Sequence, residues 1–548
     1  MAKRKAVWTV MVYLAGDNNL TSECLFALTE MKKALPGKHI NVVAQFDPRD
    51  EYLPTHRYEI NRKGANSSLF DDIIDEAHYN PATKEVQFTN ESKRAKELAA
   101  KRKLRSDEVQ TLFGGVQDLS TLSFVEEDTR DDTDTGSPAT LYNFLSFCIE
   151  AYPAEHYLVT LSGHAGGVET DYLLKDESSK GSLTFNEMKQ VFRELRNDLD
   201  GRSIDIVGMD NCLMSMGEIC YELRDLVDII VGCESFSPAS GWPYRQILER
   251  LRKDFADPKP AKKKSIKVKA AKAIVEEYVN YYSPYWMSGM SVSQSALDLR
   301  RVEELRQHVD SLGSAMDKEL KREFGGRLKN NGRQNKTAFK DKLVLAHWEA
   351  QSYNGERFVD LFDFCSCLEE RSPSSEIVSK CRELRRFIAD DFVLKSCYSG
   401  AAYQYSYGVS IYFPWAQVAA KYQNLDFVKN SSGTGWLSFL RTYAQLTRRR
   451  PRGAESSNAA LTSGNGVGRP SNRMVDDRMV DDRMVDDRMV DDRMVDDRMV
   501  DDRMMSTEGN RISSMRNPPV VFLPTDCIRD HKDSRKTLKK FFSARPKS

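Results

Sequence analysis

The fold is decided by two short stretches, Tyr157-Leu-Val-Thr-Leu-Ser-Gly-His164-Ala-Gly-Gly167 and Ile204-Asp-Ile-Val-Gly-Met-Asp210-Asn-Cys212. Each is a run of apolar and β-branched residues that ends in a polar turn, which predicts a buried strand. The segment between them carries an amphipathic helical pattern over 183–199, as in a strand–helix–strand crossover. The two strands are therefore expected to be parallel neighbours, with His164 and Cys212 at the same edge of a sheet.

The same alternation of strands and helices runs through the first half of the chain. Strands are expected at 7–15, 40–46, 157–161, 204–209 and 227–231, and helices at 19–34, 138–151, 183–199 and 213–223. This order predicts an α/β fold, in which helices cover both faces of a mostly parallel sheet. The first apolar run follows a basic start and so imitates a secretion signal. Its polar Thr9 and the turn-forming residues 16–19 favour a strand instead.

Three regions are expected along the chain. Residues 1–256 form a catalytic core with a polar insertion near 62–130, and 257–446 continue the same fold after a basic linker at 257–273. In the tail, 447–548, Arg-Met-Val-Asp-Asp repeats six times between 473 and 502. A period of five gives no constant apolar face on a helix or a strand, so the tail is expected to be disordered. It is also a candidate docking segment for an unidentified protein.

Composition excludes several classes of protein. The 548 residues contain 81 basic and 81 acidic side chains, and this balance argues against nucleic-acid binding. No apolar run is long enough to cross a membrane. Ten cysteines without a CxxC pair indicate neither a zinc site nor a disulfide framework, and no metal ligand is expected. Reduced thiols, together with the interpretation of the N-terminus as a strand, predict a cytoplasmic location.

Cys212 and His164 are the candidates for chemistry. A thiol within reach of an imidazole is the minimal activated nucleophile of a cysteine enzyme. A helix expected directly after Cys212 favours the thiolate through its free N–H groups. Backbone N–H groups at Cys212 and Ala165 are candidates for stabilising an oxyanion. Taken alone, however, a cysteine at a strand end is more often a core residue. The other histidine of this region, His156, lies at the opposite end of the strand that leads to His164 and is interpreted as structural.

Several motifs in the same order resemble the clostripain family of cysteine peptidases, in the caspase-like clan. They are Trp8-Thr-Val-Met-Val-Tyr-Leu-Ala-Gly-Asp-Asn-Asn-Leu20, Gly136-Ser-Pro-Ala-Thr-Leu141, Tyr152-Pro-Ala-Glu-His-Tyr157, Asp205-Ile-Val-Gly-Met-Asp-Asn-Cys-Leu-Met214, Gly241-Trp-Pro-Tyr244 and Gly408-Val-Ser-Ile-Tyr-Phe-Pro414. The resemblance spans roughly 6–446 and leaves out the tail. It implies a caspase-like three-layer α/β/α sandwich and an endopeptidase acting on proteins or peptides, often after Arg or Lys.

The resemblance assigns roles to individual residues. It makes Cys212 the nucleophile and His164 the general base and acid, which act through an acyl-enzyme. It places Asp210 in the pocket for the P1 side chain, where an anion pairs with a guanidinium or ammonium group. Trp242 belongs to the segment that lines the cleft, and Ser240 stands where a relative can carry a second pocket acid.

The resemblance also raises open questions. Ala165 replaces the glycine that usually follows the histidine, which would be strained if this position needs a positive φ. Internal self-cleavage is hypothesised at Lys175 or Lys180. The chemistry needs no cofactor; calcium is used by some relatives, although no calcium-binding loop is present. Two alternatives stay open, a catalytically inactive caspase-like scaffold and a different thiol hydrolase or transferase on the same fold.

Overall fold

The computed structural model describes residues 5–34, 37–49, 55–60, 77–80, 85–88, 124–126, 134–256, 263–329, 338–429, 435–448 and 522–523. Most of the insertion expected near 62–130 lies outside the described residues. The same holds for the tail and its repeats, apart from the strand β15 (Phe522–Leu523). Among the described residues, no helix is both long and apolar enough to cross a bilayer.

A ten-stranded sheet runs through the molecule in the order β15-β13-β10-β9-β8-β7-β1-β2-β3-β6. Its five central strands are parallel: β1 (Ala6–Gly16), β2 (Ile40–Pro48), β7 (Ala154–Ser162), β8 (Ile204–Asp210) and β9 (Val227–Gly232). Antiparallel strands extend both sides: β3 (His56–Glu59), β6 (Phe124–Glu126), β10 (Val292–Asp298), β13 (Val393–Ser399) and β15. The five strands expected in the first half of the chain are these central ones. A separate hairpin pairs β4 (Ala77–Asn80) with β5 (Glu85–Phe88).

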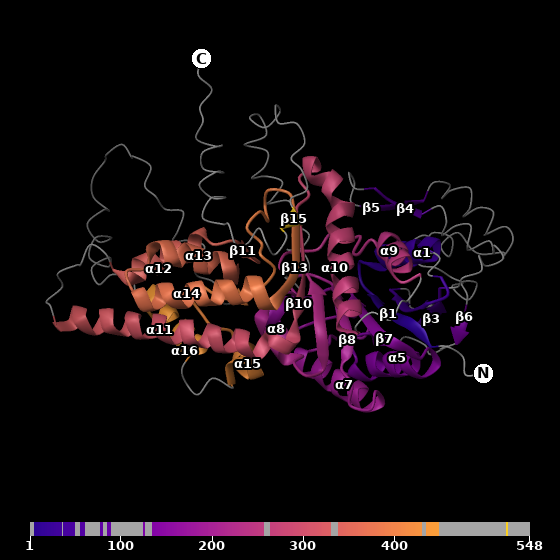
Figure 1. Cartoon of the computed structure of the whole chain (residues 1–548), viewed down its shortest axis with the longest axis horizontal. Coiled ribbons are helices and arrows are strands. Elements are labelled where there is room, and N and C mark those ends of the chain that lie inside the picture. Colours follow the sequence, from indigo (N-terminus) through magenta and orange to yellow (C-terminus); the bar gives the residue numbers. More distant parts are fainter. Residues whose placement is uncertain are drawn as a thin grey trace, which may run out of the picture.

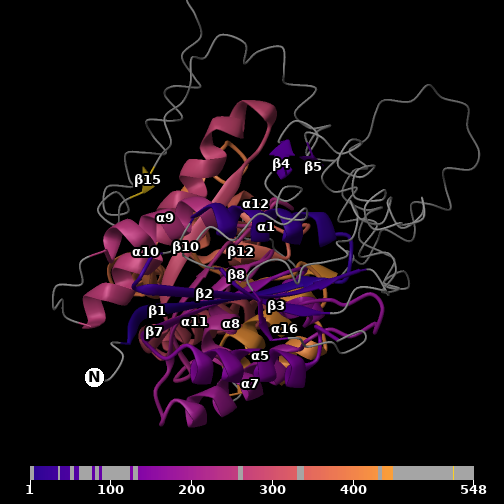
Figure 2. The ribbon, with the colours of Figure 1, turned by 90° about the vertical axis from the view of Figure 1, so that its right-hand side faces the viewer.

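Helices cover both faces of this sheet (Figures 1 and 2). One face carries α1 (Thr21–Ala34), α9 (Tyr244–Asp254) and α10 (Lys263–Tyr282), and the other carries α5 (Pro138–Ala151), α7 (Phe185–Asp198) and α8 (Gly217–Glu222). Val10 and Val12 of β1 join the apolar cluster on the first face, whereas Met11 and Tyr13 join the cluster on the second. This alternation follows from the two-residue period of a strand. The expected three-layer sandwich is confirmed.

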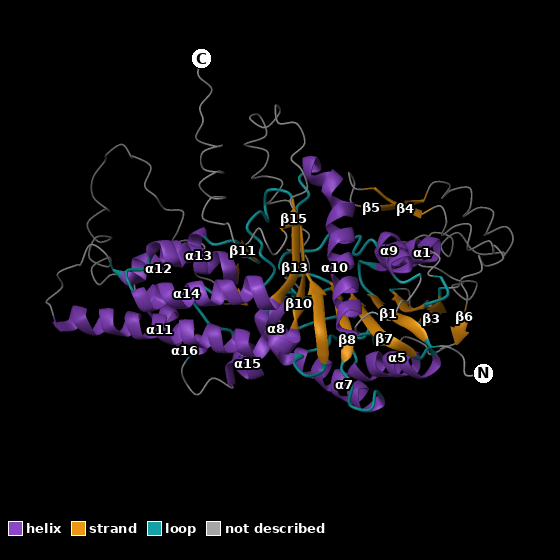
Figure 3. Ribbon diagram, viewed as in Figure 1, coloured by secondary structure: helices purple, strands orange, loops and turns teal. Residues whose placement is uncertain are grey.

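The C-terminal helices form a group to one side of the large sheet (Figure 3). Their buried apolar residues belong to the cluster on the second face of the sheet. They are α11 (Val302–Lys329), α12 (Phe339–Glu349), α13 (Leu361–Arg371), α14 (Ser375–Phe387) and α16 (Trp436–Arg448). A small antiparallel sheet accompanies them, formed by β11 (Ser352–Tyr353), β12 (Phe358–Asp360) and β14 (Ser410–Tyr412). The short α-helices are α6 (Gly167–Thr170) and α15 (Asp426–Lys429). The chain also forms short 3₁₀ helices at Ser283–Ser288, Leu299–Arg301 and Lys421–Asn424 and a π-helix at Ile388–Phe392.

The basic linker expected at 257–273 is wrong in its second half. Residues from Lys263 onward already belong to α10. Lys267 is held at the edge of the sheet by ion pairs with Asp205, at 3.5 Å, and with Asp228. Lysine has a good helix propensity, and these carboxylates balance its charge, so the basic run continues the helix instead of separating two regions.

Candidate active site

The two adjacent strands β7 and β8 bring His164 and Cys212 to one place. The strands are parallel, and Ser162 is paired with Asp210 at their carboxyl ends. His164 lies two residues after Ser162, and Cys212 lies two residues after Asp210. The two chains are about 5 Å apart at this pair, so His164 and Cys212 start from neighbouring positions. Both side chains are half-buried, and both line the same cavity of about 480 Å³, a volume that includes its opening to solvent. The structure thus brings together the two residues that the sequence predicted for the chemistry.

The surroundings of Cys212 differ from those expected. No helix starts directly after it, because α8 begins only at Gly217. The intervening N–H groups of Leu213, Met214 and Ser215 donate instead to the carbonyl groups of Cys233 and Ser235. Leu213 takes a left-handed conformation with φ of 63°, which turns the chain sharply after the cysteine. The helix predicted at 213–223 is therefore wrong in its first turn, and a helix dipole does not act on this thiol.

A backbone N–H group interacts with the sulfur in place of the helix. The amide of Ser237 donates to Cys212 Sγ at 3.3 Å. A hydrogen bond to the charged form of an acid favours that form, so this amide stabilises a thiolate.

His164 is oriented by a residue that sequence reasoning missed. Its Nε2 lies 2.6 Å from Oδ1 of Asn19, in the turn after β1. An amide oxygen can only accept a hydrogen bond, so Nε2 carries the hydrogen and Nδ1 is the nitrogen of the neutral ring that can accept a proton. The sequence marks Asn19 only as one of the turn-forming residues after the first strand. Its role depends on β1 lying next to β7, which the sequence did not predict.

Ala165 occupies its position without backbone strain, because it is not among the residues with positive φ. It forms an antiparallel bridge with Leu173, in which the flanking groups His164 O and Gly166 N make the hydrogen bonds. The N–H group of Ala165 itself has no hydrogen-bond partner among the described residues. The left-handed conformation falls instead on Gly167, with φ of 66°.

Asp210 lies in the wall of the cavity and is 5% exposed. Tyr244 donates its hydroxyl to Asp210 Oδ2 at 2.7 Å, while Oδ1 has no hydrogen-bond partner among the described residues. Burial raises the pKa of Asp210 to about 6, although hydrogen bonds from Tyr244, Trp242 and Ser162 oppose the rise. Oδ1 is also shielded from solvent, so a cationic group that reached Asp210 through the cavity would supply the partner that this oxygen lacks.

Of the two other residues expected at the cavity, Ser240 lines it and Trp242 does not. Ser240 lines the cavity, and its hydroxyl pairs with that of Tyr282 at 2.7 Å. Trp242 does not line it: the ring is 3% exposed and lies over Gly208 of β8, where an added Cβ would approach it to 2.5 Å. Glu23 in the first turn of α1 also lines the cavity, and sequence reasoning missed it.

The loop after His164 holds the two lysines of the self-cleavage hypothesis. Lys180 is exposed and lies in an exposed run that begins at Ser178. Lys175 is half-buried, and its carbonyl accepts a hydrogen bond of 2.8 Å from Asn18 Nδ2. His156, by contrast, is buried and contacts Asp205 through Nδ1 at 2.9 Å, which fits the structural role expected for it.

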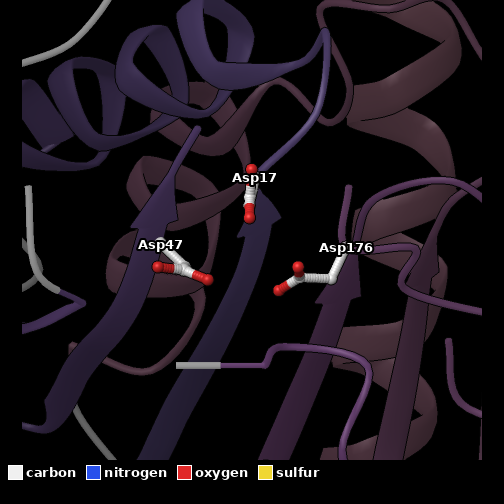
Figure 4. Close-up of side chains that lie close together, drawn as sticks. All are labelled: Asp17, Asp47 and Asp176. Atoms are coloured by element: carbon white, nitrogen blue, oxygen red, sulfur yellow. The ribbon is translucent and has the colours of Figure 1, made fainter. Parts of the chain in front are cut away.

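No metal ligand was expected from the sequence. The structure nevertheless brings Asp17, Asp47 and Asp176 together near the carboxyl ends of β1 and β2 (Figure 4). None of the three lines the cavity that contains Cys212.

A parallel sheet that presents a thiol and an imidazole from neighbouring strand ends defines a cysteine-type peptidase. The chain belongs to the clostripain family, whose family model matches residues 12–443. It is similar to clostripain from Hathewaya histolytica, with 20% identity over 412 residues, which cover 69% of this chain and 68% of the relative. The family inferred from the motifs is therefore confirmed.

Two solved structures are also similar to this chain. One is a secreted C11 cysteine protease from Bacteroides thetaiotaomicron bound to an irreversible peptide inhibitor, with 15% identity and a TM-score of 0.48 over 78% of this chain and 99% of that chain. The other is an inactive zymogen C11 protease from Parabacteroides distasonis, with 18% identity and a TM-score of 0.47 over 79% of this chain and 99% of that chain. The predicted cytoplasmic location is corrected by this comparison, because the protease from B. thetaiotaomicron is described as secreted.

Proposed function

We propose that this cysteine peptidase cleaves peptide bonds after Arg or Lys, with Cys212 as nucleophile and His164 as general base and acid. The observation that carries the proposal is a single cavity lined by the thiol, the imidazole and the carboxylate of Asp210. Among the described residues that line this cavity, none is Lys or Arg. A basic side chain is thus attracted into it, and an acidic one is repelled.

The reaction follows from these positions. Nδ1 of His164 takes the proton of Cys212, and the sulfur attacks the carbonyl carbon of the scissile bond. The C–N bond then breaks, and the imidazolium returns the proton to the departing amine. The resulting thioester is hydrolysed by a water molecule, whose proton passes to His164 and then to the sulfur, so that the enzyme is regenerated.

The oxyanion formed in each half of the reaction needs donors. Backbone N–H groups at Ala165 and Cys212 are the candidates. The unpartnered N–H of Ala165 and its relaxed backbone support this role. One such donor contributes about 10²- to 10³-fold to kcat in acyl transfer.

Specificity for a basic P1 residue rests on two acids. Asp210 offers its unpartnered Oδ1, and Glu23 adds a second carboxylate from α1. Ser240 contributes a hydroxyl to the same wall. Binding of a basic P1 side chain is favoured over binding of a neutral side chain of equal length, because the neutral one leaves the buried carboxylate of Asp210 without a cationic partner.

Paired fluorogenic peptides with Arg, Lys, Ala or Asp at P1 test the function. The wild type is expected to turn over the Arg and Lys peptides, and Cys212→Ala is expected to lose at least about 10³-fold in kcat. Turnover of the Asp peptide alone would overturn the pocket assignment and keep the nucleophile. No turnover of any peptide, before and after limited nicking by trypsin and with added calcium, would instead indicate an inactive scaffold.

A further inference from the structure

An uncharged surface rich in aromatic residues lies beside the cavity that contains Cys212. Two loops form it, 283–291 between α10 and β10 and 400–407 after β13. No Asp, Glu, Lys or Arg occurs in 278–297 or in 396–420, although 30% of the whole chain is charged. We call the two loops the aromatic rim.

The rim presents apolar side chains to solvent. Met287 is 69% exposed, which is the highest exposed fraction among the large apolar side chains of the described chain. Tyr285 and Trp286, which precede it, are half-buried, and so are Tyr403 and Tyr405 in the second loop. Aromatic and methionine side chains without neighbouring charge are typical of surfaces that bind another polypeptide.

The two loops of the rim are in contact with each other. β10 and β13 are antiparallel, and Val292 at the start of β10 pairs with Ser399 at the end of β13. Beyond this pair, Ala402 N donates to Ser291 Oγ at 3.2 Å. Both loops therefore leave the large sheet at one edge and form a single surface there.

The rim continues the wall of the cavity. Tyr282, the last residue of α10, donates its hydroxyl to the carbonyl of Gly241 at 2.5 Å and pairs with Ser240 Oγ at 2.7 Å. One turn earlier in the helix, the hydroxyl of Tyr278 pairs with Ser237 Oγ at 3.0 Å. The three partners all line the cavity. The first loop of the rim begins directly after Tyr282 and so starts at the cavity wall.

The side of the cavity on which the rim lies determines which part of a substrate it meets. The leaving amine takes its proton from His164, so the residues after the scissile bond, P1′ onward, lie toward β7. In the sheet, β7 is on one side of β8, whereas β9, β10 and β13 are on the other (Figure 1). The residues before P1 therefore extend toward the rim. Two strand spacings, about 10 Å, separate β8 from β10, and P2–P4 of an extended peptide span this distance at about 3.3 Å per residue.

We propose that the aromatic rim binds the P2–P4 side chains of the substrate and selects apolar residues over charged ones. The proposal rests on the proposed function, because Cys212 and His164 orient the substrate. A charged side chain would lose water at the rim without gaining a partner of opposite charge. An aromatic or aliphatic side chain would instead cover Tyr285 and Met287 and remove apolar surface from water. The peptidase would thus recognise a basic residue that is preceded by apolar ones.

Peptides with Arg at P1 and one varied position test this preference on the full chain. Leu or Tyr at P2, P3 or P4 is compared with Ser and Glu at the same position, and the same four residues are placed at P2′ and P3′ of quenched peptides. At least one of P2–P4 is expected to favour Leu or Tyr over Ser by about tenfold in kcat/KM, mainly through KM, and to disfavour Glu. The corresponding ratio at P2′ and P3′ is expected to stay within about threefold.

Matched variants locate the preference. Met287→Ser and Tyr285→Ser are each expected to lower the ratio of kcat/KM for Leu to that for Ser by at least about threefold. Trp348→Ser removes a similarly exposed side chain, 66% exposed, from α12, which does not line the cavity, and is expected to keep the ratio. Because Met287 is exposed, its replacement should leave Tm unchanged.

A binding measurement gives the same comparison without chemistry. Fluorescence anisotropy follows labelled peptides that end in Arg and carry Leu or Ser at P2–P4, bound to the Cys212→Ala chain. The Leu peptide is expected to bind at least about tenfold more tightly, and adding Met287→Ser should reduce this difference.

Three kinetic results would overturn the role of the rim while leaving the proposed function in place. One is cleavage of the Arg peptides at equal kcat/KM for Leu, Ser and Glu at every position from P2 to P4. Another is a preference that persists in both Met287→Ser and Tyr285→Ser, which would place it elsewhere. The third is an apolar preference confined to P2′ and P3′, which would reverse the direction of the substrate.

Failure of the proposed function has a different signature. No cleavage of any peptide with a basic P1 residue would count against that function, and the anisotropy measurement would then decide about the rim. Equal binding of the Leu and Ser peptides to Cys212→Ala would overturn the proposal, whereas tighter binding of the Leu peptide that depends on Met287 would support it.

Discussion

The amide oxygen of Asn19 lies 2.6 Å from Nε2 of His164, although 145 positions separate the two residues in the chain. This contact joins the turn after β1 to the end of β7, since the two strands are parallel neighbours. It fixes the tautomer of the imidazole and directs Nδ1 away from Asn19. In the proposed mechanism, Asn19 is therefore the residue that orients the base.

Removing the orienting amide is expected to slow the reaction without abolishing it. Asn19→Ala should lower kcat by about tenfold to a hundredfold, with little change in KM, since the general base is retained but misplaced. Asn19→Asp keeps the acceptor and adds a negative charge, which favours the imidazolium. This variant should recover part of kcat. The acidic limb of its pH profile should move to higher pH.

The control for this prediction is Asn41→Ala. Asn41 lies on β2 and donates to Thr9 Oγ1 at 3.1 Å, near the opposite end of the sheet. Asn41→Ala should have the same kcat and the same pH profile as the wild type. Equal losses of kcat in Asn19→Ala and Asn41→Ala would show that the contact between Asn19 and His164 has only a structural role.

The preference for a basic P1 residue should depend on pH through Asp210. Its carboxyl has a pKa of about 6, so it loses its charge as the pH falls through that value. The ratio of kcat/KM for Arg peptides to that for Ala peptides is therefore expected to decline below about pH 6. Tyr244→Phe removes a hydrogen bond that favours the ionised form, so this decline should move to higher pH.

Asp210→Asn is the corresponding substitution at the acid itself. It should lower kcat/KM for Arg peptides by about 10²-fold and spare the Ala peptide, because a buried charge pair is lost while the thiol and imidazole remain. Steady-state kinetics with both peptides measures the difference. A uniform loss on both substrates would show that Asp210 supports the fold of the site and does not select the P1 residue.

A second carboxyl pair should make the stability of the protein depend on pH. Glu234 and Asp360 are buried together beside β14, and Glu234 accepts from Gly408 N at 2.8 Å. Burial, and for Glu234 also the charge of Asp360, raise both pKa values, that of Asp360 to about 7. The folded state thus holds protons that the unfolded chain has released. Because the two carboxyl groups are hydrogen-bonded to each other and titrate together, stability should fall by up to about 1 kcal/mol per pH unit for the pair as pH rises from 5 to 7.

Urea unfolding at several pH values measures this effect. Glu234→Gln supplies a permanent hydrogen-bond donor to Asp360 and should flatten the dependence at a cost of about 1 kcal/mol or less at pH 5. Glu383→Gln, an exposed site on α14, serves as the control. An unchanged pH slope in Glu234→Gln would show that this pair does not cause the pH dependence.

Self-cleavage, if it follows the specificity proposed above, should occur after Lys180. That residue is exposed, whereas the carbonyl of Lys175 is held by Asn18. Intact mass after incubation should show a split in the wild type and in Lys175→Gln, and none in Lys180→Gln. A split after Lys175 that persists in Lys180→Gln would reverse the assignment, and an active chain that never splits would remove the hypothesis.

The sequence was sufficient for the elements whose pattern is local. The apolar runs at 157–161 and 204–209 predicted adjacent parallel strands, and hence the meeting of His164 and Cys212. The helix after Cys212 was placed too early because tertiary bonds to residues 233–235 override the local pattern. Asn19 and Glu23 were missed because their positions at the site depend on how β1 and α1 lie against β7 and β8, which no local pattern records.

The most direct test of the account compares wild type, Cys212→Ala and Asp210→Asn on peptides that differ only in Arg or Ala at P1. The account predicts that the wild type prefers Arg, that Cys212→Ala cleaves neither peptide, and that Asp210→Asn loses the preference but keeps its activity on Ala. Undiminished cleavage of the Arg peptide by Cys212→Ala would contradict the central claim that this thiol is the nucleophile.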